Sequence, residues 1–141
     1  MAVIPPQKEK GTMNREILFR GKRKQDGMWC HGDLVRLKDG DTQMPYIYYF
    51  GEVYPASIGQ FTGVYDKNGD EIYEGDILEF DGAEIPEEER AVVIYADGRF
   101  RLKNPRYDYM DDLDSLTASM EIIVGNTYDG IYGEDKRGAE E

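Results

Sequence analysis

Residues 66–80 read DKNGDEIYEGDILEF, and this stretch decides the fold class of the chain. Asn68-Gly69 stands between two runs of strand-forming residues, and both residues tolerate the positive φ angles that a tight hairpin turn requires. Beyond the turn, Leu78 and Phe80 fall on one face of an extended chain and Glu79 falls on the other. The stretch therefore predicts two antiparallel strands joined by a hairpin.

The same pattern repeats along the chain, with a strand-like run at intervals of about ten residues. The turns that separate the other runs also contain glycine, at Asp26-Gly27, Asp39-Gly40 and Asp97-Gly98. This spacing predicts a mainly β fold, a small β-barrel or sandwich built of hairpins. The C-terminal half has the features of an SH3-like barrel.

Residues 108–120 form the one segment whose pattern predicts a helix. Asp111 and Asp112 stand where acidic residues suit a helix N-terminus. The apolar residues that share one helical face are Leu113, Leu116 and Met120. The fold is therefore expected to contain at most one short helix, near residues 111–120.

The length of 141 residues fits one domain with a single core. Eleven Tyr, five Phe and one Trp supply the large side chains that a charge-rich disordered chain lacks. The two ends are polar or charged and have little to bury. We therefore expect a flexible N-terminal extension over residues 1–13, a single mainly β domain over 14–130, and a flexible charged tail over 131–141.

The net charge is −12 at pH 7, so the long-range field of the protein repels nucleic-acid phosphates and anionic lipids. We therefore expect neither direct nucleic-acid binding nor membrane binding. Cys30 is the single cysteine and His31 the single histidine, which excludes an internal disulfide and a Cys/His zinc site. These features fit a reducing cytoplasm.

The segments that resemble catalytic or metal-binding motifs lack features that these motifs require. Residues 66–70 open like an EF-hand calcium loop, but Glu71 replaces the glycine of position six and Ile77 replaces the glutamate of position twelve. Cys30 and His31 are adjacent, and neighbours on a strand point to opposite faces, so they do not form a nucleophile–base pair. We therefore predict a protein that is not an enzyme and that uses no metal or cofactor.

One acidic cluster is a candidate site for a divalent cation, because Mg²⁺ and Ca²⁺ prefer carboxylate oxygens. Its members are Asp108, Asp111, Asp112 and Asp114. On a helix these four side chains spread around more than one face, and the helix dipole already explains acids at a helix start. A metal site is therefore the weaker interpretation of this cluster.

Four residues are candidates for binding a partner. Arg20 and Lys22 belong to the basic cluster of residues 15–24 and share one face of an expected strand. They form either an ordinary solvated face or a surface for a phosphate or an acidic partner, such as residues 84–89 of a second copy. Tyr46 and Tyr48 share a face of an aromatic strand expected over residues 46–50, which is buried on at least one face. Their rings belong either to the core or to an interface.

Several pieces of the chain, in this order, resemble the YopX family of phage and prophage proteins over about residues 14–130. The pieces are residues 17–22 (ILFRGK), Trp29, residues 32–35 (GDLV), residues 58–63 (IGQFTG), residues 66–77 (DKNGDEIYEGDI) and residues 123–128 (IVGNTY). The resemblance implies a mainly β fold, carriage on phages or prophages, and self-association. It supplies no catalytic residues.

These observations together predict a phage or prophage accessory protein of uncharacterised role that acts as a non-enzymatic binding or assembly module. Its expected partners are further copies of itself or an unidentified protein. Two alternatives remain open. The chain is an acidic decoy that mimics nucleic acid and blocks a DNA-binding protein, or it is a hydrolase that uses the carboxylates of residues 108–114 with a divalent metal.

Overall fold

The computed structural model describes residues 15–81, 90–104 and 109–132, and most of the regular structure in these ranges is β-strand. A 3-10 turn, η1 (Pro55–Ser57), and a single helical turn, α1 (Ser115–Ala118), interrupt the strands. The strands are β1 (Phe19–Lys22), β2 (Trp29–Gly32), β3 (Leu34–Asp39), β4 (Thr42–Ile47), β5 (Gly51–Glu52), β6 (Gly59–Tyr65), β7 (Glu71–Tyr73), β8 (Asp76–Phe80), β9 (Ala91–Ala96), β10 (Arg99–Asn104), β11 (Tyr109–Asp112), β12 (Glu121–Asn126) and β13 (Gly130–Ile131).

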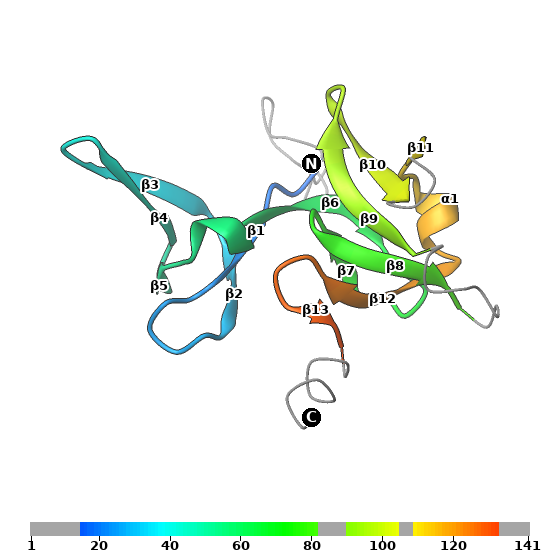
Figure 1. The fold of residues 1–141 in the computed structure, drawn as a ribbon, viewed down its shortest axis with the longest axis horizontal. Coiled ribbons are helices and arrows are strands. Elements are labelled where there is room, and N and C mark those ends of the chain that lie inside the picture. The colour runs from blue at the N-terminus through cyan, green and yellow to red at the C-terminus, as the bar shows by residue number, and fades with distance from the viewer. Residues whose placement is uncertain (1–14, 82–89, 105–108, 133–141) are drawn as a thin grey trace, which may run out of the picture.

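The strands form three antiparallel sheets. Their strand orders are β2-β1-β6-β7, β11-β10-β9-β8-β12-β13 and β3-β4-β5. Figure 1 shows the β3–β4 hairpin extending away from the six-stranded sheet, with β6 running between the two sides of the molecule. The predicted mainly β fold built of hairpins is confirmed.

None of these sheets closes into a barrel within the described ranges. The ladder between β8 and β9 consists of Ile77 opposite Val92 and Leu78 opposite Ala91. The outer strands of the six-stranded sheet, β11 and β13, lie at opposite ends of its strand order. The C-terminal half is therefore an open sheet, and not the SH3-like barrel that its turns suggested, because both architectures use the same turn chemistry.

Two predicted hairpin turns form as expected. The β9–β10 turn is Asp97-Gly98, whose φ angles of 55° and 79° are both positive, as a type I′ turn requires. In the β6–β7 turn, Asp66 Oδ1 accepts hydrogen bonds from the backbone N–H groups of Asn68 and Asp70, each at 2.9 Å. Gly69 takes a φ of 83° in the same turn. The Asp66 carboxylate therefore closes this hairpin together with two backbone hydrogen bonds, from Asp66 N–H to the Asp70 carbonyl oxygen and from Gly69 N–H to the Asp66 carbonyl oxygen.

The interior is divided into two hydrophobic clusters, and not the single core expected from the chain length. The larger cluster combines buried residues of β7, β8, β9, β10 and α1: Ile72, Leu78, Val93, Leu102 and Ala118. The smaller cluster belongs to the N-terminal half and contains Cys30, Ile47 and Val53. Contacts between the two packed regions therefore decide how the N-terminal strands are held against the six-stranded sheet.

The helix predicted over residues 108–120 is much shorter in the structure. Tyr109–Asp112 form strand β11, in which Asp112 makes ion pairs with Arg99 at 2.6 Å and Arg101 at 3.2 Å on neighbouring β10. These cross-strand pairs give the acidic residues a partner in a strand that a helix does not offer. The predicted acidic helix start is therefore a strand edge, and Asp108 lies outside the described residues.

The helical turn itself begins after Asp114, whose side chain accepts a hydrogen bond of 2.7 Å from the backbone N–H of Thr117. Ala118 is its buried residue, whereas Leu116 is 73% exposed. The predicted apolar face of this helix was therefore wrong. The expected single short helix near residues 111–120 is confirmed.

Among the described residues, no helix combines the length and the apolar character that crossing a membrane requires. The predicted extension over residues 1–13, the acidic segment 84–89 and nearly all of the predicted tail lie outside the described ranges.

Candidate functional site

A buried ion pair joins the N-terminal strands to the six-stranded sheet. Arg20 of β1 is 8% exposed and Asp76 of β8 is fully buried, and their Nη1 and Oδ1 atoms are 2.7 Å apart. The second Asp76 oxygen accepts a hydrogen bond of 2.7 Å from the backbone N–H of Tyr73. Burial raises the pKa of Asp76, and the Arg20 guanidinium acts against that rise. The pair is therefore stable only as a unit, because removing one charge leaves the other buried.

Aromatic rings enclose the Arg20 guanidinium. Its Cζ atom lies 4.9 Å from the ring centroid of Trp29 and 5.1 Å from that of Tyr73, which is cation–π geometry. Arg20 Nη2 also donates a hydrogen bond of 3.4 Å to the Glu74 carbonyl oxygen. Arg20 is therefore held by groups of β2, β7 and β8 at the same time.

A second ion pair crosses the same junction. Lys22 Nζ lies 2.6 Å from Asp129 Oδ1, and Trp29 Nε1 donates to Asp129 Oδ2 at 2.8 Å. Partial burial opposes ionisation of Asp129, but hydrogen bonds from Lys22, Trp29 and Asn126 lower its pKa overall. The Tyr128 ring meets Trp29 edge to face, with centroids 6.1 Å apart. The loop after β12 is therefore fixed to β1 and β2.

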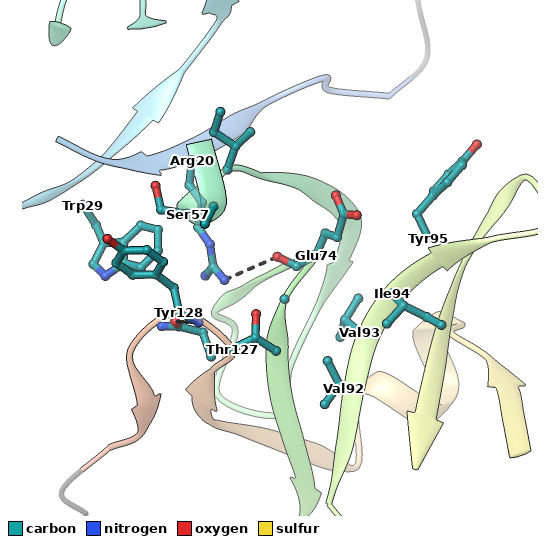
Figure 2. A pocket seen from close by; sticks show the side chains of 14 residues that line it. Arg20, Trp29, Ser57, Glu74, Val92, Val93, Ile94, Tyr95, Thr127 and Tyr128 are labelled. Atoms are coloured by element: carbon teal, nitrogen blue, oxygen red, sulfur yellow. Dashed lines mark hydrogen bonds between the residues drawn. The ribbon is translucent and has the colours of Figure 1, made fainter. Parts of the chain in front are cut away.

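A cavity of about 280 Å³ opens beside this junction. Figure 2 shows Arg20, Trp29 and Tyr128 on one side of it and residues Val92 to Tyr95 of β9 on the other. Gly75 N–H donates to the Val93 carbonyl oxygen at 2.8 Å, and β8 begins only after this point. The cavity therefore lies where β9 continues past the start of its neighbour β8.

The structure places the two basic candidates, Arg20 and Lys22, inside this junction. Both lie on β1 and both pair with acids of the same chain, so their charges are neutralised within the monomer. Sequence reasoning missed Asp76, Asp129 and Trp29 as their partners. The two acids are more than 50 positions away along the chain, and no local spacing connects them with β1.

The aromatic candidates lie elsewhere, at the connection between β4 and β5. Tyr46 is partly buried, and β4 ends at Ile47, which is fully buried in the smaller core cluster. The chain then turns through Tyr48, Tyr49 and Phe50, which we call the aromatic turn. The prediction of a buried strand through residue 50 was therefore wrong, because Gly51 begins β5 and the chain must reverse first.

The aromatic turn presents its rings to solvent. Tyr48 is 66% exposed and Tyr49 is 90% exposed, and the Tyr49 and Phe50 rings meet edge to face at 6.1 Å. Tyr49 has a φ of 78°, a left-handed conformation that is strained for a residue with a side chain. The backbone is pinned on both sides, since Tyr48 N–H donates to Asp33 O at 2.8 Å and Arg23 Nη1 donates to Phe50 O at 3.2 Å.

The described carboxylates, Cys30 and His31 form no group of three or more that could hold a metal ion. Within the acidic cluster, Asp112 pairs with arginines and Asp114 caps α1. Cys30 is buried and His31 is exposed, and burial raises the pKa of the Cys30 thiol.

Comparison with known proteins gives a match over most of the chain. The model of the family described as YopX protein matches residues 18–130. A comparison with curated proteins gives no match. Among solved structures, the crystal structure of protein EF1440 from Enterococcus faecalis is similar, with 22% sequence identity and a TM-score of 0.48. That alignment covers 80% of this chain and 94% of EF1440.

Proposed function

This chain belongs to the YopX family, and on that premise we propose that it is a non-enzymatic binding and assembly module that self-associates. It acts as a phage or prophage accessory protein inside its bacterial host cell. The observation that carries the proposal is the aromatic turn, with three consecutive aromatic side chains exposed to solvent.

Exposure of these rings is costly for an isolated monomer. Burying one large side chain contributes about 1.5–3 kcal/mol, and Tyr and Phe are enriched where proteins meet. Tyr49 also keeps a strained backbone conformation while its ring packs mainly against Phe50. Strained backbone conformations are found mainly at functional sites. The strain at Tyr49 is therefore expected to place its ring where a partner contacts it.

The position of the aromatic turn favours a further copy of the chain as the partner. It lies in the β3-β4-β5 sheet, whose β3–β4 hairpin extends away from the body of the molecule in Figure 1. The outer edge of β3 carries backbone groups without a strand partner in the described ranges, and unpaired edges favour association. The aromatic turn follows β4 at the end of the sheet where Leu34 pairs with Ile47, away from the hairpin tip, and its exposed rings can meet a neighbouring copy without a rearrangement of either core.

The decoy alternative has less support. Some of the described surface carboxylates are paired with basic residues, including Asp112 with Arg99 and Glu52 with Lys24. Such pairing interrupts a continuous negative surface. No described arrangement favours the hydrolase alternative.

Light scattering on the purified protein tests the proposal. The wild type is expected to give a mass that is a multiple of 16.2 kDa at micromolar concentration. A variant with Ser in place of Tyr48, Tyr49 and Phe50 is expected to run as a monomer with an unchanged circular dichroism spectrum. Tyr65→Ser with Tyr95→Ser is the matched control, because these tyrosines are also exposed but lie outside the aromatic turn. A monomeric wild type, or an aromatic-turn variant with the wild-type mass, would contradict the proposal.

A further inference from the structure

A second cavity, of about 360 Å³, is lined by residues of β8, β9, β10, β11, α1 and β12. Its apolar lining comes from Phe80, Ala91 and Leu102, on β8, β9 and β10. Its polar lining includes Asp111, Asp112, Asp114, Thr117 and Glu121, and no Lys or Arg is among the described residues around it. The cavity therefore combines apolar walls with several acidic groups.

Glu121 is the unusual member of this lining. It is 4% exposed, and its Oε2 atom is buried without a hydrogen-bond partner. Phe80 stands opposite Glu121 in the β8–β12 ladder, so an aromatic residue and not a base is its neighbour across the strands. A buried carboxyl oxygen without a partner costs free energy. The side chain therefore has an unfilled bonding position inside a cavity.

The other acids of the cavity differ in how far they are already engaged. Asp112 pairs with Arg99 and Arg101, and Asp114 caps α1. Asp111 stands opposite Leu102 in the β10–β11 ladder, which places it on the side of β10 that lines the cavity. Asp111, Asp114 and Glu121 thus have no basic partner among the described residues, and of these three Asp114 is already engaged by the backbone of α1.

Several ligand classes fail to fit this lining. The described acids form no group that could hold a metal ion, so a bare divalent cation lacks its ligand set. Anions are repelled by the carboxylates. A volume of about 360 Å³ greatly exceeds the ~30 Å³ share of one water molecule and has room for a short alkyl chain. The apolar walls suit that chain, and the unpartnered carboxyl suits an N–H donor with positive charge.

We propose that this cavity binds an alkylammonium or alkylguanidinium group, with Glu121 as its main hydrogen-bond acceptor and Asp111 as a second acidic contact. The cationic end donates to the free Glu121 oxygen, and the alkyl chain lies against Phe80, Ala91 and Leu102. Such a group is carried by a small free amine or guanidine, or by a Lys or Arg side chain of another protein.

Burial raises the pKa of Glu121 to about 7, which supports the same conclusion. A carboxyl that is partly protonated near neutral pH is ready to release its proton when a cation arrives, because the cation favours the charged form. Binding near pH 7 is therefore expected to release protons. The heat of binding will then differ between buffers of different ionisation enthalpy.

Calorimetric titration of the full chain with n-butylammonium at about 150 mM salt tests the proposal, since this salt weakens non-specific attraction to the −12 charge. We expect saturable binding at one site per chain, with n-butanol at least tenfold weaker because it carries no charge. Glu121→Gln is expected to weaken n-butylammonium binding at least tenfold and Asp111→Asn several-fold. Asp39→Asn, which removes one exposed charge at the end of β3, is the matched control and should change nothing.

Two further arms identify the source of the cation. Butylguanidinium tests the alternative head group, and a blocked Gly-Lys-Gly peptide tests a protein side chain. The probe that binds most tightly shows which of these chemistries the cavity prefers. Equal binding of n-butanol and n-butylammonium would overturn the proposal. So would wild-type affinity in Glu121→Gln, and so would the absence of saturation for every cationic probe. Melting curves of the Gln variant establish that it is folded during the measurement.

Discussion

At the scale of single residues, the Arg20–Asp76 pair shows how a charge is kept in the interior. Its two partners are neutralised only by each other, and aromatic rings close over the guanidinium. Asp76→Ala is therefore expected to lower the free energy of unfolding by about 3–5 kcal/mol, the usual cost of leaving a buried charge unpaired. Urea unfolding at pH 7 measures this loss.

The control for this prediction is Asp112→Ala, which removes an acid from an exposed ion pair with Arg99. Solvent screens that pair, so its loss is expected to be much smaller. If the two variants lost the same small amount of stability, Arg20 would have another way of satisfying its charge, and the junction would not depend on this pair.

Glu121 makes a second prediction at this scale. Its pKa lies near 7 in the folded protein, against an ordinary value of 4.5. Between these values the unfolded chain has released the proton and the folded chain has kept it, so stability falls as pH rises from 4.5 to 7. The full difference is on the order of 3 kcal/mol, present as a loss above pH 7 and absent below pH 4.5.

Glu121→Gln is expected to remove this loss, so the variant should be more stable than the wild type at pH 7.5 and close to it at pH 5. Urea unfolding at the two pH values checks the prediction. The other charged groups near Glu121 are present in both proteins, so their contributions cancel in the comparison. They are Asp111, Asp112 and Asp114 of the cavity, Arg99 and Arg101 beyond them, and the Lys67–Asp81 ion pair. A parallel pH dependence of the two proteins would show that the Glu121 pKa is ordinary.

At the scale of elements, β6 and the segment at Glu74 approach so closely that only glycine fits at position 59. A Cβ atom at Gly59 of β6 would lie 2.3 Å from the Glu74 carbonyl oxygen, so Gly59→Ala must push the two segments apart. Gly98→Ala is the matched control: Gly98 has a φ of 79° but open space around it, so the substitution adds backbone strain of about 1 kcal/mol and no clash. Thermal melts should show a larger loss for Gly59→Ala. The reverse order would mean that β6 and Glu74 separate easily.

Local signals in the sequence predicted some elements and not others. The turns at Asp97-Gly98 and Asn68-Gly69 were predictable because these residue types favour turns by themselves, and Asp97, Gly98 and Gly69 do take positive φ angles. The N-terminal part of the segment expected to be helical, residues 109–112, is a strand because Asp112 finds its partners across the sheet, on β10. Helix propensity depends on the residues nearby in the sequence, so it does not include ion-pair partners that tertiary structure brings close.

The candidate site was predictable to a smaller extent. Arg20 and Lys22 were found as a basic pair on one strand face, but their acidic partners come from β8 and from the loop after β12. Tyr48 was found as one of two aromatic candidates, whereas the turn that exposes it depends on Ile47 being buried beside Val53. Glu121 gave no signal at all, since its burial is a property of the assembled sheet.

At the scale of the whole molecule, the two hydrophobic clusters and the junction between them explain why the β3–β4 hairpin can project from the body. The smaller cluster packs β2, β4 and Val53 together, and the Arg20 and Lys22 ion pairs fix that region to the six-stranded sheet. The aromatic turn is therefore presented from a rigid base. Rigid presentation lowers the entropic cost of binding a partner.

The molar mass of a Tyr49→Gly variant tests most directly whether the aromatic turn mediates self-association. Glycine accepts a φ of 78° without strain, and the Tyr49 ring is 90% exposed, so the substitution is expected to leave the stability of the monomer unchanged or slightly higher. The molar mass from light scattering should at the same time fall to that of the 16.2 kDa chain at concentrations where the wild type is a multiple of it. A Tyr49→Gly protein that keeps the wild-type mass would contradict self-association through the aromatic turn.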